Sequence, residues 1–310
     1  MLRDKMLAVI SELNGEIAER AELIHAIAMA LLSGSNLFIL GDPGQAKSFA
    51  INEFRKRITG TRQFERLLSK QTDEEALFGR LDLASLIPGA VPAQVLAKDP
   101  HYQQMKQQLN AIMQTVQTNP ADTAAAARLK QLTEAMEQYQ KGLSLLTEGT
   151  PTTITKGKIP DAHIVFLDEI FKAGDGILNS LLTVLNERRY TNEGVTTDVP
   201  VISFFSASNE IPNFRNAEEQ ILAPLYDRFQ LKVVTRNVQN RKARLRILKE
   251  KQNEQFGTVT ATIALGELYA MQRQVQLVPV PESINELMDD VLCELRRQNI
   301  TVSDRKFFGF

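Results

Sequence analysis

A short segment near the N-terminus combines glycine, lysine and serine at the spacing that holds a phosphate group. The segment reads Gly41-Asp42-Pro43-Gly44-Gln45-Ala46-Lys47-Ser48. Its glycines let the backbone turn so that successive N–H groups point at one anion. Lys47 would reach the terminal phosphates of a nucleotide, and the Ser48 hydroxyl would bind Mg²⁺. The pattern therefore predicts a phosphate-binding loop, which we extend through Phe49 in the helix that follows.

The residue before Lys47 is Ala46, whereas loops of this kind usually carry glycine there. Glycine at that position allows close packing of the helix on the loop, and alanine is the smallest alternative. The competing interpretation is an ordinary Gly-Pro turn before a helix. An apolar strand precedes this segment and an amphipathic helix follows it, which is the context that a phosphate loop requires. We therefore favour the phosphate loop.

Two acids follow a second apolar run. Asp168 and Glu169 come directly after residues 164–167, Ile-Val-Phe-Leu. A buried strand that ends in two acids places both carboxylates at the carboxyl edge of a parallel sheet, where such sheets bind ligands. We expect Asp168 to hold the Mg²⁺ shell and Glu169 to orient and polarise an attacking water. Considered alone, the pair would more often be a charge pair at a helix N-terminus.

Two further polar residues stand next to predicted strands. Asn209 follows the strand over residues 201–206, where its amide could contact a γ-phosphate or the attacking water. A helix cap or turn is the alternative role for Asn209. Arg228 comes just before a strand over residues 230–234. It is either a member of a surface ion pair, which is weak and common, or an arginine finger that stabilises transition-state charge.

These residues need a scaffold of alternating strands and helices. Apolar runs at residues 36–40, 164–167, 201–206 and 230–234 predict buried strands. Apolar residues at helical spacing predict helices over residues 6–33, 48–57, 177–188 and much of 238–310. We also expect a hairpin over about residues 190–200, turning at Asn192-Glu193-Gly194. Strands alternating with helices around a glycine-containing loop predict a parallel sheet in an α/β domain.

The composition changes between Asp99 and about Glu148, which is rich in Gln and Ala. Apolar residues fall on one helical stripe from Tyr102 to Val116 and on a second from Leu129 to Leu143, with a turn signal at residues 118–122. We therefore expect a helical hairpin with narrow apolar seams, inserted into the main domain. The seams could pack on each other, or the hairpin could contact a partner.

The overall composition excludes several classes of protein. The 310 residues carry a formal net charge of −1, which argues against a strongly basic nucleic-acid binder. The single cysteine, Cys293, excludes an internal disulfide framework and a cysteine-based zinc site. The longest apolar runs are shorter than a membrane span, and the N-terminus does not have the pattern of a signal peptide. We therefore expect a cytoplasmic protein without a membrane span.

Together these segments resemble the AAA+ ATPases, and among them the MoxR family and its RavA-like branch. The similarity covers about residues 10–97 and 155–310, and Ala46 is familiar in that branch. The matching segments are residues 40–48, 165–170, 181–188, 207–210 and 225–228. The resemblance implies a P-loop NTPase fold, a parallel sheet flanked by helices. It also implies a large nucleotide-binding domain over residues 1–235, with the insertion at about 98–150, and a smaller helical lid domain over 236–310.

The resemblance also implies roles for individual residues. Lys47 and Ser48 belong to Walker A, and Asp168 and Glu169 belong to Walker B. Asn209 matches sensor 1, and Arg228 matches the arginine finger that acts in trans on ATP held by a neighbouring subunit. Arg305 matches the sensor 2 arginine at the start of a lid helix. The chain ends soon afterwards, at Phe310, so we expect either a fragment or a short lid.

The implied protein is a ring, usually a homo-hexamer, in which hydrolysis of ATP with Mg²⁺ remodels or chaperones a client protein. A partner with a von Willebrand A domain is common in the family. Two other functions remain open: a nucleotide-gated binding module, and a DNA-associated motor. An intact Glu169 argues against the first. The near-neutral charge and the absence of tryptophan argue against the second, so we expect no nucleic acid partner.

Overall fold

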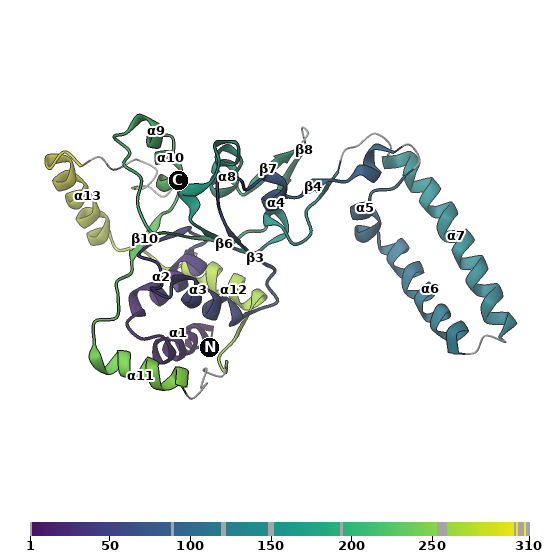
Figure 1. Cartoon of the computed structure of the whole chain (residues 1–310), viewed down its shortest axis with the longest axis horizontal. Coiled ribbons are helices and arrows are strands. Elements are labelled where there is room, and N and C mark those ends of the chain that lie inside the picture. Colours follow the sequence, from purple (N-terminus) through teal and green to yellow (C-terminus); the bar gives the residue numbers. More distant parts are fainter. Residues whose placement is uncertain are drawn as a thin grey trace. The chain divides into compact units, whose positions relative to one another are not determined.

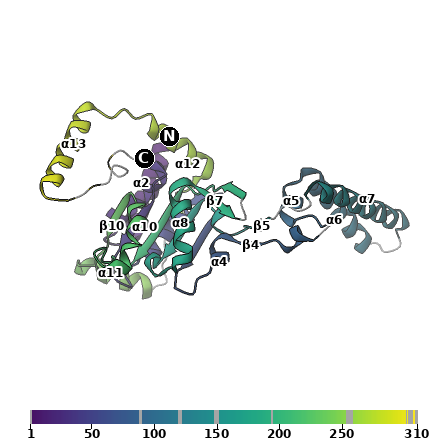
Figure 2. The same ribbon diagram turned by 90° about the horizontal axis from the view of Figure 1, so that it is seen from above.

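The computed structural model describes residues 2–87, 90–118, 122–147, 152–192, 195–252, 259–300, 302 and 307. The chain folds into two compact units. One consists of residues 1–77, 157–191 and 196–310, and the other of residues 78–156 and 192–195. In Figure 1 and Figure 2 the first is an α/β body and the second is dominated by a pair of long helices.

The α/β unit is built on a sheet of five parallel strands in the order β10-β1-β9-β6-β3. The strands are β1 (Leu37–Leu40), β3 (Gln63–Leu67), β6 (Ile164–Asp168), β9 (Ser203–Ser208) and β10 (Leu231–Val234). Four of them are the apolar runs that the sequence predicts, and the predicted parallel α/β fold is therefore confirmed. The sequence analysis missed β3, because it is an edge strand in which Phe64 alone is buried.

Helices account for most of the remaining described residues. In the α/β unit they are α1 (Leu2–Glu16), α2 (Ala21–Ser33), α3 (Lys47–Lys56), α4 (Glu74–Phe78), α8 (Asp175–Glu187), α9 (Ala217–Gln220), α10 (Ala223–Asp227), α11 (Arg241–Gln252), α12 (Leu265–Gln276) and α13 (Glu282–Arg297). The predicted helical segment over residues 6–33 is divided into α1 and α2. A left-handed residue, Glu19 with φ 54°, lies in the turn that separates them.

Helices cover both faces of the sheet. Successive side chains of a strand point to opposite faces, so each apolar strand offers side chains to be buried on both. Leu37 and Ile39 of β1 point into a core that they share with α1, α2 and α3. Phe38 points the other way, and its ring centroid lies 5.4 Å from those of Phe171 and Tyr226. Figure 1 shows α1, α2, α3 and α12 below the sheet and α8 and α10 above it.

The chain after β10 is mostly helical, as the sequence predicts. Leu268 and Met271 of α12 pack into the same core as α1 and α2. Just before α12, β11 (Ile263–Ala264) pairs in parallel with β2 (Ile58–Thr59), which follows α3. This part of the chain is therefore joined directly to the α/β body. The division into two domains at residue 236 stays a prediction.

The second unit contains the predicted helical hairpin. Its helices are α5 (Ala93–Lys98), α6 (Pro100–Thr118) and α7 (Thr123–Thr147), and β4 (Arg80–Leu81) pairs antiparallel with β5 (Thr153–Ile154). The seams of α6 and α7 pack on each other, with Met105 and Met136 buried. The Tyr139 hydroxyl donates to Asp99 at 3.0 Å. Residues 119–121 of the predicted turn lie outside the described residues.

A short hairpin is also present, formed by β7 (Arg189–Asn192) and β8 (Val195–Asp198), where the sequence predicts one. Residues 193–194 of its predicted turn are outside the described part of the chain. Short 3₁₀ turns occur at Leu83–Leu86, Ile159–Asp161 and Ile170–Lys172. Among the described residues, no helix combines the length and the apolar character that a membrane crossing requires.

Candidate functional site

A cavity of about 330 Å³ lies at the carboxyl edge of the sheet. Ten residues line it, and all ten are predicted site residues: Pro43, Gly44, Gln45, Ala46, Lys47, Ser48, Phe49, Asp168, Glu169 and Asn209. They converge because parallel strands end at one edge. In the register of the sheet, Leu40 is opposite Ser208, and Asp168 is opposite Ala207. Segments distant in the sequence therefore reach the same cavity.

The loop between β1 and α3 has the geometry of a tight turn that ends in a helix. The Gly41 N–H donates to the carbonyl of Ser208 at 3.1 Å, which holds the start of the loop against β9. Gly44 and Ala46 both have positive φ, 81° and 57°. The left-handed backbone at position 46 is the local reason why glycine suits this position, since only glycine adopts it without steric cost. The first turn of α3 then directs its free N–H groups towards the cavity.

Lys47 lies at the centre of the site. Its ammonium group donates to the carbonyls of Gly41 and Asp42 and, at 3.2 Å, to Oδ1 of Asn209. Burial lowers the pKa of Lys47, and the neighbouring carboxylates Asp168, Glu169 and Asp42 partly oppose this shift. The ammonium group is therefore short of solvation, and an anionic ligand would stabilise its charged form.

The two acids are held at the end of β6 by a strained turn. Glu169 adopts the left-handed conformation with φ 53°, and its N–H donates to Oδ1 of Asp168 at 3.1 Å. Glu169 Oε2 lies 3.3 Å from the ammonium of Lys172. It makes no hydrogen bond there, although it is buried. Burial raises the pKa of Asp168, and the charge of Glu169 adds to the shift.

The donor set fits a magnesium ion that is shared with a ligand. Ser48 and Asp168 offer hydroxyl and carboxylate oxygens, the ligands that Mg²⁺ prefers. A cation near Asp168 would offset the burial that raises the pKa of this carboxyl. No cluster of three or more His, Cys, Asp or Glu side chains that could hold a metal is present in the described part of the chain. The remaining ligands of the ion would be water and phosphate oxygens, which is the usual arrangement for Mg²⁺.

Four predicted site residues are not among those that line the cavity. Gly41 and Asp42 belong to the loop, and their carbonyls accept hydrogen bonds from Lys47. Arg228 lies directly after α10, where its Nε donates to the carbonyl of Leu182 at 3.1 Å and its Nη1 to that of Pro224 at 2.7 Å. Its predicted role in trans stays a prediction. Arg305 lies outside the described residues, and its role as sensor 2 therefore stays a prediction.

The sequence analysis missed two buried residues that contact the loop from outside. Arg20, just before α2, donates from Nε to the carbonyl of Gln45 at 3.0 Å. Thr235, just after β10, donates to Oε1 of Gln45 at 2.7 Å. No motif marks either residue. The one available signal concerns Thr235. It directly follows β10, which neighbours β1 in the sheet, so it ends beside the start of the loop.

Comparison with protein families gives an independent result. Residues 4–103 and 110–273 match a protein-family model described as the MoxR domain in the MoxR-vWA-beta-propeller ternary systems. Two uncharacterized proteins of Methanocaldococcus jannaschii are similar, with 30% identity over 98% of this chain and 28% identity over 96%. The chain spans 62% and 61% of the lengths of these relatives.

Comparison with solved structures addresses the fold. A crystal structure of a candidate ATPase from Cytophaga hutchinsonii matches with a TM-score of 0.59 and 14% sequence identity. The match covers 94% of this chain and 68% of that one. At this level of identity the similarity concerns the fold, and it agrees with the parallel sheet and flanking helices described above.

Proposed function

Because the chain belongs to the MoxR-type AAA+ ATPases, we propose that it binds ATP with Mg²⁺ over residues 41–49 and hydrolyses the terminal phosphoanhydride bond. One observation carries the proposal. Lys47, which is buried, lies 3.2 Å from Asn209 in a cavity that Asp168 and Glu169 also line. A cation, a polar amide and two acids are the groups that phosphoryl transfer to water requires.

Each residue has a role that follows from its position. Lys47 and the N–H groups of the loop bind and orient the phosphates. Ser48 and Asp168 would hold Mg²⁺, which supplies charge neutralisation between the phosphates when it is bound. Glu169 orients the attacking water and polarises it towards the phosphorus. Asn209 contacts the water or the γ-phosphate, since its amide already lies beside Lys47.

The assembly is a finer part of the proposal. We infer a homo-hexameric ring of the RavA-like branch, in which Arg228 completes the site of a neighbouring subunit. Residues 236–310 would act as the lid that moves with the nucleotide state, and Arg305 as its sensor 2 residue. The ring would remodel or chaperone a client protein together with a partner that carries a von Willebrand A domain. The description of the matching family model, which names MoxR-vWA systems, supports such a partner.

The decisive experiment measures ATP hydrolysis per subunit as a function of protein concentration, from well below to well above micromolar. A steep rise is expected, because each site would need an arginine from a neighbour. A flat rate above zero would refute the ring and the role of Arg228 in trans. No turnover by the wild-type protein at any concentration, with tight ATP binding retained, would refute hydrolysis by this chain alone. In mixtures, Arg228→Ala and Glu169→Gln subunits should recover activity that neither has separately.

A further inference from the structure

Gln45 is held from several sides although it belongs to a loop. The residue as a whole is 4% exposed. Oε1 accepts a hydrogen bond from Thr235 at 2.7 Å, and Nε2 donates to Asp42 at 3.2 Å and to Asn237 at 3.4 Å. The backbone carbonyl of Gln45 accepts from Arg20 at 3.0 Å. The middle of the phosphate loop is therefore fixed to the segment after β10 and to the segment before α2.

Gly41 lies directly against the hydrogen bond between Thr235 and Gln45. A Cβ atom at position 41 would lie 2.0 Å from Oγ1 of Thr235 and 2.4 Å from Oε1 of Gln45. Such distances are far inside van der Waals contact. The first glycine of the loop is therefore required by the Thr235–Gln45 hydrogen bond, which runs through the space that a side chain would fill.

The turn between α1 and α2 joins the loop to α11. Arg20 reaches the loop carbonyl, as described, and is nearly fully buried. The neighbouring Glu19 is left-handed, and its carboxylate accepts hydrogen bonds from the backbone N–H groups of Gln239 at 2.8 Å and Asn240 at 2.7 Å. These N–H groups lie directly before α11. Asn240 caps this helix, since its Oδ1 accepts from the N–H of Lys242 at 2.8 Å, and Glu19 therefore anchors the capping residue from another part of the chain. The two hydrogen bonds lower the pKa of Glu19.

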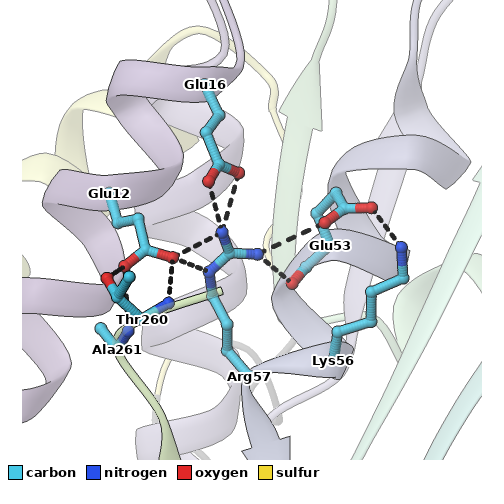
Figure 3. Close-up of polar contacts among 7 residues, drawn as sticks. All are labelled: Glu12, Glu16, Glu53, Lys56, Arg57, Thr260 and Ala261. Atoms are coloured by element: carbon cyan, nitrogen blue, oxygen red, sulfur yellow. Dashed lines mark hydrogen bonds and ion pairs between the residues drawn. The ribbon is translucent and has the colours of Figure 1, made fainter. Parts of the chain in front are cut away.

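The segment just before β11 is anchored in a different way. Glu12 of α1 accepts from the N–H of Ala261 at 2.9 Å and from Thr260. The same carboxylate receives Nη2 of Arg57 at 2.7 Å, at the C-terminal end of α3 (Figure 3). Arg57 is completely buried and also pairs with Glu16 at 2.7 Å. This second anchor is thus part of the core, whereas Glu19 is exposed.

We propose that Gln45, Arg20 and Glu19 are positioning residues that couple the shape of the phosphate loop to the placement of α11. The proposal rests on the function proposed above, since a nucleotide is what changes the loop. A phosphate that reorients the loop at Gln45 moves both partners of Gln45, namely Arg20 and Thr235. Glu19 passes the change to the start of α11, while the Arg57 anchor stays fixed. By linkage, the position of α11 must then alter the affinity for the nucleotide by the same factor.

The test uses the full chain with Mg²⁺ and ADP or a non-hydrolysable ATP analogue. Glu19→Ala removes the anchor on the residues that begin α11 without touching the cavity. Glu22→Ala, an exposed acid in the first turn of α2, is the matched control. Thr235→Val removes the hydroxyl that donates to Gln45 and keeps the side chain shape. The two readouts are hydrogen exchange of the amides at residues 239–240 and the nucleotide affinity, with kcat measured separately.

In the wild type, nucleotide should slow exchange at residues 239–240. Glu19→Ala should abolish this response and weaken nucleotide binding about fivefold or more, while kcat at saturation stays close to that of the wild type. Glu19→Asp, which keeps both carboxylate oxygens, should restore part of the response, and Thr235→Val should weaken binding in the same direction. Wild-type protein that binds nucleotide without any change at residues 239–240 would overturn the coupling. Wild-type protein that binds no nucleotide would refute the proposed function itself.

Discussion

Helix α3 has a buried cation at each end, and the two ends differ in what surrounds that cation. At the N-terminal end, Lys47 donates to two loop carbonyls and to Asn209 and faces a cavity of about 330 Å³. Just past the C-terminal end, Arg57 meets the carboxylates of Glu12, Glu16 and Glu53 (Figure 3). The hydrogen bonds of Lys47 go to neutral groups, with carboxylates only nearby, whereas Arg57 binds carboxylates directly.

The pKa shifts follow this difference. Burial lowers the pKa of Lys47 and raises that of Asp168, so the charged forms of both groups are destabilised around the cavity. At the other end, burial tends to raise the pKa of Glu12. Hydrogen bonds from Thr260, Ala261 and Arg57 outweigh this and lower it to about 2. Desolvation therefore dominates at Lys47 and Asp168, whereas hydrogen bonds dominate at Glu12.

The largest expected effect is on ligand binding at the cavity end. Lys47→Ala should reduce ATP binding to an undetectable level, because the buried cation that faces the phosphates is lost. The matched control is Lys56→Ala at the other end of α3, where the side chain is 62% exposed, and it should bind ATP like the wild type. Calorimetric titration with ATP and Mg²⁺ measures both variants. Equal affinity of Lys47→Ala and the wild type for ATP would contradict the assignment of residues 41–49 as a phosphate-binding loop.

The next effect is on stability at the Arg57 end. Arg57→Met should lower the free energy of unfolding by about 3–5 kcal/mol, because it leaves the carboxylates of Glu12 and Glu16 without their cation. Arg189→Met, which breaks an exposed pair with Asp198, should cost at most about 1 kcal/mol. Urea unfolding of the two variants makes the comparison. Losses of the same small size would show that the Arg57 cluster is not a structural anchor.

The sequence predicted the cavity end of α3 far better than the other end. Residues 41–49 form a local motif, and the strands that bring Asp168 and Asn209 to it are continuous apolar runs. Parallel strands end at a common edge, so local patterns were sufficient to place these residues together.

The Arg57 cluster could not be predicted in this way. Its members lie on α1, on α3 and just before β11, and neither periodicity nor a motif relates a glutamate at position 12 to Thr260. The same reasoning applies to Arg20 and Thr235, which contact the loop through tertiary packing alone. The turn at Glu19 that divides the predicted long helix was also missed, because a left-handed glutamate has no signature in the sequence.

A pH titration tests the charge effects at the Arg57 end of α3. The pKa of Glu12 is lowered from 4.5 to about 2 in the folded protein, so its contribution to stability is complete above pH 4.5 and is lost as the pH falls towards 2. Glu16 opposes this trend, since burial raises its pKa and Arg57 only partly offsets the shift. Glu12→Gln should therefore be less stable than the wild type at neutral pH, and this difference should shrink between pH 4.5 and 2. A difference that stays constant would contradict the cause given for the shift.

The smallest expected effect is on stability, and it tests backbone strain at Ala46, at the cavity end of α3. Ala46 has φ 57°, a conformation that costs a residue with a Cβ about 1 kcal/mol and glycine much less. Ala46→Gly should therefore raise the free energy of unfolding by at most about 0.5 kcal/mol, after the larger entropy of glycine in the unfolded chain is taken into account. Ala50→Gly, in the interior of the same helix, should destabilise by at least about 1 kcal/mol, because it also removes a fully buried methyl group. Opposite signs for two identical substitutions four residues apart, measured by thermal unfolding, would locate the strain in the loop and not in the helix. Destabilisation by both would mean that the left-handed residue at position 46 is not strained, and that the loop end of α3 carries no cost of its own.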